Sequence, residues 1–269
     1  MADQFNLSDT TPAAPAGRIN VKWQSDVTGN VSAHAAGGVS SMSVSAFDTE
    51  TTNGTTNPQG RGVVYLSDGI YQCVWSGSAW EYYHSGQRAY RPIDSQFSWL
   101  NQSTSTVSTA TGGIYLLQPF GATQYLVIRK KAIPATPYTV TVKLIHTPYP
   151  IANLSVGICA GDGTKQHTLL ATYNSGGVQP QIEKWNSPTS YNAAYVTISA
   201  YPLSSEIWMR ISDNGTNRIS SISHDGYNFR VLHTVGRTDF VTPTEVGFAC
   251  KAQNASQDAG LLLVSWQET

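Results

Sequence analysis

The sequence predicts an all-β protein, and three observations lead to that prediction. Apolar and polar residues alternate in short runs, which is the pattern of half-buried strands. Turn-forming clusters rich in Gly, Asn, Asp and Ser separate the runs. Only 12% of the residues are charged, about half the usual share, and Ser, Thr, Asn and Gly take their place. Such a composition suits many short strands joined by tight turns.

Residues 1–50 are predicted to form an extended arm. The stretch from Asn6 to Gly17 holds two prolines among small residues, which favours an extended chain over a helix. Arg18 to Gln24 alternates like one short strand, and Val31 to Val44 has little to bury. We expect the arm to become ordered against neighbouring subunits. A disordered tail is the alternative.

Residues 51–94 are predicted to form a small β-meander. Three strand-like runs, Val63–Leu66, Ile70–Trp75 and Ala79–Tyr83, are separated by Ser- and Gly-containing turns. Aromatic residues are dense here: Tyr65, Tyr71, Trp75, Trp80, Tyr82 and Tyr83. They exceed what so small a core can bury, so we expect some to pack against another domain or chain. A sugar-stacking platform is the alternative.

Residues 95–269 are predicted to form a β-sandwich, because about a dozen strand-like runs follow one another at the spacing typical of that architecture. In the run from Tyr138 to His146, three apolar residues should face the core: Val140, Val142 and Leu144. Further on, three more recur at every second position: Ile207, Met209 and Ile211. Trp208 and Arg210 then take the opposite face, where Trp208 should be buried or stacked on a neighbouring loop.

Three motifs in this part carry a family resemblance: Trp208-x-Arg210, Ser223-x-Asp225-Gly226-x-x-Phe229 and Val246-Gly247-Phe248. With them the chain resembles the concanavalin-A-like jelly-roll superfamily, in particular its small bacterial and phage modules. The resemblance implies a jelly-roll sandwich in which the last run, Leu261–Trp266, lies beside the first, Phe97–Asn101. That fold carries lectins, glycanases and structural modules, so the function has to be argued from a site.

A second resemblance concerns the N-terminus. The stretch NLSDTTPAAPAGRINVKWQSD, followed by GNVSA, is similar to the N-terminal segment of many tailed-phage virion proteins, mostly fibres and related appendages. Residues 60–94 are similar to small hairpins common in phage tail and fibre proteins. These resemblances imply a virion protein made in the cytoplasm of a bacterial host.

Composition excludes several classes of partner. Lys plus Arg is 16 and Asp plus Glu is 17, so no basic excess points to nucleic acid. No window approaches the roughly 18 apolar residues of a membrane helix, and the N-terminus lacks the pattern of a signal peptide. Three widely spaced cysteines, Cys73, Cys159 and Cys250, are predicted to be buried free thiols.

The sequence shows no catalytic pattern, and we predict that the protein is not an enzyme. Glycanases of this fold often carry paired carboxylates on one strand, whereas the glutamates here stand apart: Glu183, Glu206, Glu245 and Glu268. Ser223-His224-Asp225 holds the three residue types of a serine triad, but neighbouring side chains on a strand end point in different directions. A glycan-cleaving enzyme remains the least favoured alternative.

No cofactor is predicted. Calcium is the alternative, because three loops hold an acid: Asp162-Gly163, Asp213-Asn214-Gly215 and Asp225-Gly226. Calcium needs six to eight oxygen ligands, and no segment has that density of carboxylates. The histidines show no spacing typical of zinc sites.

A carbohydrate site would use aromatic faces and amides at loop tips. The sequence offers four such aromatic residues, predicted to lie in loops: Tyr149, Trp185, Tyr191 and Tyr227. The alternative is that most of them pack inside the sandwich.

Together these observations predict a virion structural protein of the tail-fibre or head-appendage type. It would attach through the arm to other virion proteins, form a homotrimer, and present the jelly roll for weak multivalent adhesion to host-surface glycan. A purely structural capsid decoration (cement) protein is the main alternative.

Overall fold

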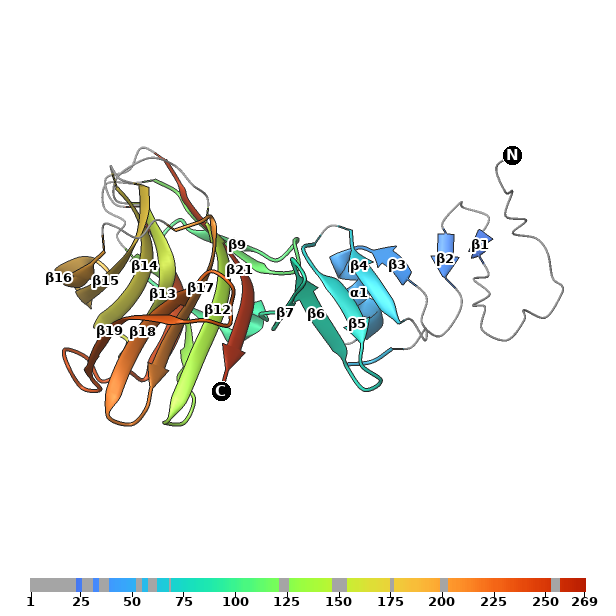
Figure 1. Ribbon diagram of the computed structural model, residues 1–269. Helices are drawn as coiled ribbons and strands as arrows, with labels where there is room; N and C mark the ends of the chain where they lie inside the picture. Colours follow the sequence, from blue (N-terminus) through green and yellow to red (C-terminus); the bar gives the residue numbers. More distant parts are fainter. Residues whose placement is uncertain are drawn as a thin grey trace. The chain divides into compact units, whose positions relative to one another are not determined.

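The computed structural model describes residues 23–25, 31–33, 39–51, 55–57, 62–67, 69–120, 126–146, 154–174, 177–198, 203–252 and 257–269. The chain divides into two compact units, Met1–Arg88 and Ala89–Thr269 (Figure 1). This division differs from the sequence-based boundaries, which separated residues 1–50 from residues 51–94. Most of the predicted arm lies outside the described residues.

The N-terminal unit is built on one five-stranded sheet in the order β3-β4-β5-β6-β7. Its elements are β3 Val39–Met42, α1 Val44–Thr51, β4 Val63–Leu66, β5 Gln72–Trp75, β6 Trp80–His84 and β7 Gln87–Ala89. A separate pair, β1 Trp23–Ser25 and β2 Val31–Ala33, is antiparallel. β3 pairs parallel with β4, so residues 39–50, which the sequence-based boundaries assigned to the arm, contribute a strand and a helix to this unit.

The helix α1 explains where the aromatic residues of this unit go. The hydroxyl of Ser43 accepts a hydrogen bond from the backbone N–H of Ala46 at 3.2 Å, which caps the helix start. Phe47 is fully buried, and its ring packs edge-on against Trp80 at 5.3 Å and Tyr82 at 6.2 Å. The helix thus helps to bury Trp80 within this unit, while Tyr65 stays 46% exposed. The number of aromatic residues in this unit therefore no longer supports a homotrimer, which stays a prediction.

The C-terminal unit is a sandwich of two seven-stranded sheets (Figure 1). The first, called the β17 sheet, has the order β19-β18-β17-β12-β21-β10-β9. Its strands are β9 Thr106–Ser108, β10 Ile114–Gln118, β12 Tyr138–His146, β17 Glu206–Asp213, β18 Asn217–Ser223, β19 Arg230–Gly236 and β21 Ala259–Glu268.

The second sheet, called the β13 sheet, has the order β16-β15-β14-β13-β20-β11-β8. Its strands are β8 Ser98–Leu100, β11 Leu126–Ala132, β13 Leu154–Gly161, β14 Gln166–Asn174, β15 Gly177–Ser187, β16 Ser190–Thr197 and β20 Glu245–Ala252. A short 3-10 turn, η1 Asp94–Gln96, precedes β8. The predicted all-β sandwich is therefore confirmed.

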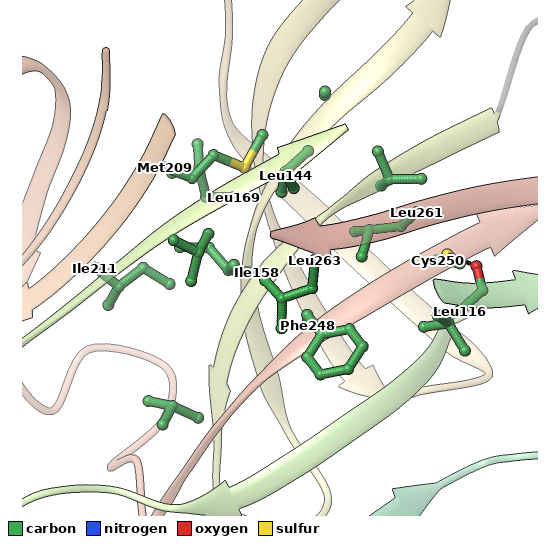
Figure 2. Close-up of a cluster of buried hydrophobic side chains, with 14 of the residues drawn as sticks. Leu116, Leu144, Ile158, Leu169, Met209, Ile211, Phe248, Cys250, Leu261 and Leu263 are labelled. Atoms are coloured by element: carbon green, nitrogen blue, oxygen red, sulfur yellow. Dashed lines mark hydrogen bonds between the residues drawn. The ribbon is translucent and has the colours of Figure 1, made fainter. Parts of the chain in front are cut away.

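The core lies between the two sheets, where alternate residues from both meet (Figure 2). The inward residues of β17 are buried to 1% exposure or less: Ile207, Met209 and Ile211. Those of β12 are buried likewise: Val140, Val142 and Leu144. Both face assignments made from the sequence are confirmed. Trp208, on the opposite face of β17, is also buried, with 6% exposure.

The last strand does not lie where the family resemblance placed it. β21 is a central strand of the β17 sheet between β12 and β10, whereas β8 is the edge of the β13 sheet beside β11. Phe97, just before β8, meets β21 across the core, where its ring packs edge-on against Trp266 at 5.0 Å. Local alternation predicts strands, but it does not tell which sheet a strand joins.

The three cysteines are free and buried, as predicted. Burial raises the pKa of the Cys159 thiol to about 12, so the thiol stays protonated and unreactive. Among the described residues, no helix is long and apolar enough to cross a membrane.

Replacing Ile211 by Ala should lower the free energy of unfolding by about 2–5 kcal/mol, because a fully packed side chain leaves a cavity between the sheets. Chemical denaturation of the full chain measures the change. A loss below about 0.5 kcal/mol would mean that this side chain is not in the core.

Candidate functional site

The loop between β18 and β19 is held in one conformation by the carboxylate of Asp225. Its Oδ1 accepts hydrogen bonds from the backbone N–H groups of Tyr227 at 2.9 Å and Asn228 at 2.8 Å. Oδ2 accepts one from the Asn228 side-chain amide at 2.7 Å, and the Ser223 hydroxyl donates to Oδ1 at 2.7 Å. The backbone N–H of Asn228, followed by these other donors, holds the pKa of Asp225 well below its usual value.

Gly226 lets the loop lie directly on the sheet. Its φ is +75°, in the left-handed region that favours glycine. A Cβ at this position would lie 2.7 Å from Cε2 of Trp208. The loop backbone thus covers the indole of Trp208, as expected when that ring was predicted to be buried or stacked on a loop.

Next to Trp208 on the same face, Arg210 is stacked under the loop. Its guanidinium carbon lies 3.5 Å from the ring centroid of Phe229. Its Nε donates to the hydroxyl of Thr141 on β12 at 2.9 Å. Stacking and the hydrogen bond together fix the plane of the guanidinium.

Beside Trp208 and Arg210, two apolar side chains are exposed on the outer side of the β17 sheet. Tyr227 is 77% exposed and Val231 is 57% exposed. Val231 pairs with Ser221, which in turn pairs with Arg210. We call the surface formed by Trp208, Arg210, Tyr227, Phe229 and Val231 the Tyr227 platform. Sequence reasoning found Tyr227, but it missed Arg210 and Phe229 as parts of one surface.

Trp185 does not lie in a loop, and that prediction is wrong. It lies in β15 and is fully buried, packed with a small cluster on the β13 sheet: Leu126, Ile128, Cys159 and Ala249. Its indole N–H donates to Glu183 at 2.8 Å, and Glu183 also accepts from the Lys251 ammonium at 2.9 Å. Every polar group of this trio is satisfied inside the cluster, so the indole has no face left for a ligand.

Tyr191 was also predicted to lie in a loop, but it belongs to β16. It is 45% exposed, and its ring packs edge-on against Trp185 at 5.3 Å. Tyr149 lies outside the described residues. Of the four predicted ligand residues, the structure therefore places only Tyr227 at the tip of a described loop.

The loop acids considered as calcium ligands are turned toward their own backbone. Asp162 accepts from the N–H groups of Thr164 and Lys165. Asp213 accepts from the Gly215 N–H at 2.9 Å and pairs with Arg237 at 2.8 Å. In the described part of the chain, no three His, Cys, Asp or Glu residues gather in a group that could hold a metal ion.

A second polar cluster fills the space between the sheets beside β16 and β19. Tyr195 packs against His233 at 4.7 Å and against His167 at 5.4 Å. His167 is fully buried, and its Nε2 lies 2.9 Å from the Ser220 hydroxyl. Burial first, then the charge of Arg218, lowers the pKa of His167 well below its usual value.

Arg218 ties this cluster to the loop between β19 and β20. It donates at 3.0 Å to the carbonyl oxygens of three loop residues: Arg237, Asp239 and Val241. The Asp239 carboxylate accepts from the Tyr195 hydroxyl, and the Lys184 ammonium lies 4.6 Å from the Tyr195 ring centroid. Burial also lowers the pKa of His233. The cluster thus places the neutral imidazoles of His167 and His233 beside two cations, Arg218 and Lys184.

Solved structures similar to this chain share its sandwich at low sequence identity. A functionally unknown protein from Saccharomyces cerevisiae matches with a TM-score of 0.51 and 13% identity, over 66% of this chain and 98% of that one. The GH43 protein BlXynB from Bacillus licheniformis matches with a TM-score of 0.49 and 11% identity, over 77% of this chain and 52% of that one. The matched region is thus about half of the Bacillus protein.

A seed lectin from Lotus tetragonolobus matches with a TM-score of 0.43 and 13% identity, over 67% of this chain and 96% of the lectin. At these identities the likeness shows the fold alone. No family model and no curated protein matches the chain.

One prediction from the sequence is corrected by these neighbours. The missing carboxylate pattern led us to predict that the protein is not an enzyme, but similar structures include GH43 proteins and a xylan β-1,4-xylosidase from Bacillus halodurans. We therefore withdraw the prediction that the protein is not an enzyme. None of these neighbours concerns a phage particle, so the tailed-phage resemblance stays a prediction.

The two histidines of the polar cluster should make the sandwich acid-sensitive. An imidazole whose folded pKa is depressed favours folding fully above about pH 6.5, and that contribution is lost as the pH falls below this value. Below that pH, each imidazole that binds a proton only in the unfolded state lowers the free energy of unfolding by about 1.4 kcal/mol per pH unit. Denaturation of the full chain between pH 7.5 and pH 5 measures the slope.

His167→Gln should flatten that slope, because it removes the fully buried imidazole. A wild-type slope that persists in His167→Gln would show that other groups govern the acid sensitivity.

Proposed function

We propose that the jelly-roll unit binds a glycan at the Tyr227 platform. The observation that carries the proposal is the 77% exposure of the Tyr227 ring on a loop whose backbone Asp225 holds rigid. An exposed aromatic side chain on a fixed backbone loses little conformational entropy on binding. Its apolar face suits the C–H face of a sugar ring, while its hydroxyl can exchange hydrogen bonds with sugar hydroxyls.

The surroundings of Tyr227 supply a polar rim to this apolar surface. Asn228 and Asp225 are exposed beside it, and the guanidinium of Arg210 stacks on the nearby Phe229 ring. An apolar centre with a few fixed polar groups is the usual composition of a small-ligand site. The platform is open rather than enclosed, which favours weak binding at each copy.

Weak single sites become effective when several copies act together, because tethered copies raise avidity by about 10² to 10⁴. This is the basis for the biological part of the proposal: a tailed-phage appendage protein, in the virion, that attaches through its N-terminal arm to other virion proteins and presents several jelly-roll units to the host surface. The support for that part is the sequence similarity of residues 1–35 to phage appendage proteins.

Tyr227→Ala should weaken glycan binding by roughly tenfold or more, which corresponds to about 1.4 kcal/mol. Its thermal stability should stay close to wild type, because the ring is exposed. The measurement is binding of the full chain to a glycan array, followed by calorimetry on the glycans that bind.

Tyr191→Ala is the matched control, since Tyr191 is exposed on the other sheet and should bind like wild type. Equal losses in the two variants, or none in Tyr227→Ala, would place the binding surface elsewhere. If the wild-type chain binds no glycan or host cell and particles without the protein become fragile, a capsid-decoration role replaces this proposal.

A further inference from the structure

Arg210 differs from other arginines of the sandwich because, among the described residues, its two Nη atoms have no hydrogen-bond partner. Nε donates to Thr141, but within the described part of the chain neither Nη1 nor Nη2 has a hydrogen-bond partner, and no carboxylate pairs with the side chain. Other arginines of this unit are engaged. Arg129 pairs with Asp94, Arg237 pairs with Asp213, and Arg218 donates to three carbonyl groups.

The position of this guanidinium is fixed and partly desolvated. Phe229 covers one face at 3.5 Å from the ring centroid, and burial lowers the pKa of Arg210 below its usual value. A charge that is withdrawn from water without an opposite charge costs stability. Sites that hold such a charge in a fixed orientation are frequently places where a ligand supplies the opposite charge.

Neighbouring acids of this chain are already committed to other groups. Both carboxylate oxygens of Asp225 accept hydrogen bonds from its own loop. Glu206 forms an ion pair with Lys143, whose side chain is fully buried. Asp213 pairs with Arg237 at the far end of β17. None of these three carboxylates is left for Arg210.

We propose that the glycan bound at the Tyr227 platform is acidic, and that Nη1 and Nη2 of Arg210 donate two parallel hydrogen bonds to its anionic group. This inference rests on the proposed function. A guanidinium edge matches a carboxylate or a phosphodiester in bidentate geometry, whereas an ammonium does not. The ligand class is therefore a polysaccharide that carries uronate carboxylates or phosphodiester groups.

In the proposed complex, the two contacts serve one short segment of glycan. The Cα atoms of Tyr227 and of Phe229, whose ring stacks on Arg210, lie at most about 7 Å apart. One sugar ring would rest on Tyr227 while the anionic group of the same or the next residue reaches Arg210. Without its anionic group, the same sugar keeps only the contact with Tyr227.

The test compares ligands that differ only in charge. The full chain is titrated calorimetrically with oligogalacturonate and with its methyl ester, which keeps the sugar rings and removes the carboxylate charge. A glycerol-phosphate polymer forms the third arm and distinguishes phosphodiester from carboxylate. The wild-type chain should bind one of the two anionic ligands at least tenfold more tightly than the ester, and less tightly as salt increases.

Arg210→Lys keeps the charge but removes the planar fork, so most of the preference for the anionic ligand should disappear. Tyr227→Ala should weaken acid and ester alike. Lys165→Gln removes an exposed cation elsewhere in the sandwich and should change neither. Melting temperatures of the variants identify any loss that comes from misfolding, and Arg210→Gln provides a second variant if Arg210→Lys is unstable.

The outcomes separate this inference from the proposed function. Suppose that the wild-type chain binds the acid and the ester equally and that Tyr227→Ala binds both more weakly. The inference of an acidic ligand would then be wrong, while the proposed binding surface would still hold. A charge preference that survives in both Arg210 variants would also overturn that inference. If no ligand of the array or of this series binds the wild-type chain, the proposed function itself fails.

Discussion

The strict alternation of side chains along β17 is the constraint on which the described sandwich depends. Its inward residues, Ile207, Met209 and Ile211, are buried in the core, and its outward residues, Trp208 and Arg210, support the β18–β19 loop. A shift of one residue in the pairing with β12 would exchange the two sets. Such a shift would remove the core and the platform together, so the packing that stabilises the fold also positions the surface.

Stability and recognition use different groups within this arrangement. The loop from Ser223 to Phe229 is fixed by its own carboxylate and by the glycine that lets it rest on Trp208, while Tyr227 takes no part in the core. At the other polar centre, His167 and Arg218 are buried between the sheets and hold a loop in place. The loop from Ser223 to Phe229 leaves Tyr227 exposed to solvent, whereas His167 and Arg218 point their polar groups into the sandwich.

Alternation and turn chemistry made much of the fold predictable from the sequence. They identified the faces of β12 and β17 and placed Tyr227 beside a tight turn. They could not assign β21 to a sheet, because pairing partners are chosen over long sequence distances. They missed α1, whose Ser43 cap and Phe47 contacts become visible only in the folded unit. The position of Trp185 was misjudged and the role of Arg210 was missed for the same reason, since both depend on residues from other strands and loops.

The most direct test is to map the ligand contacts on the protein in solution. In the full chain labelled with ¹⁵N, addition of an acidic oligosaccharide should shift the backbone amides of residues 224–231 and the Nε–H signal of Arg210. The amides beside Tyr195 and Asp239, at the second polar cluster, should stay unchanged. Shifts confined to that cluster, or to the surface around Tyr191, would contradict the assignment of the Tyr227 platform as the binding surface.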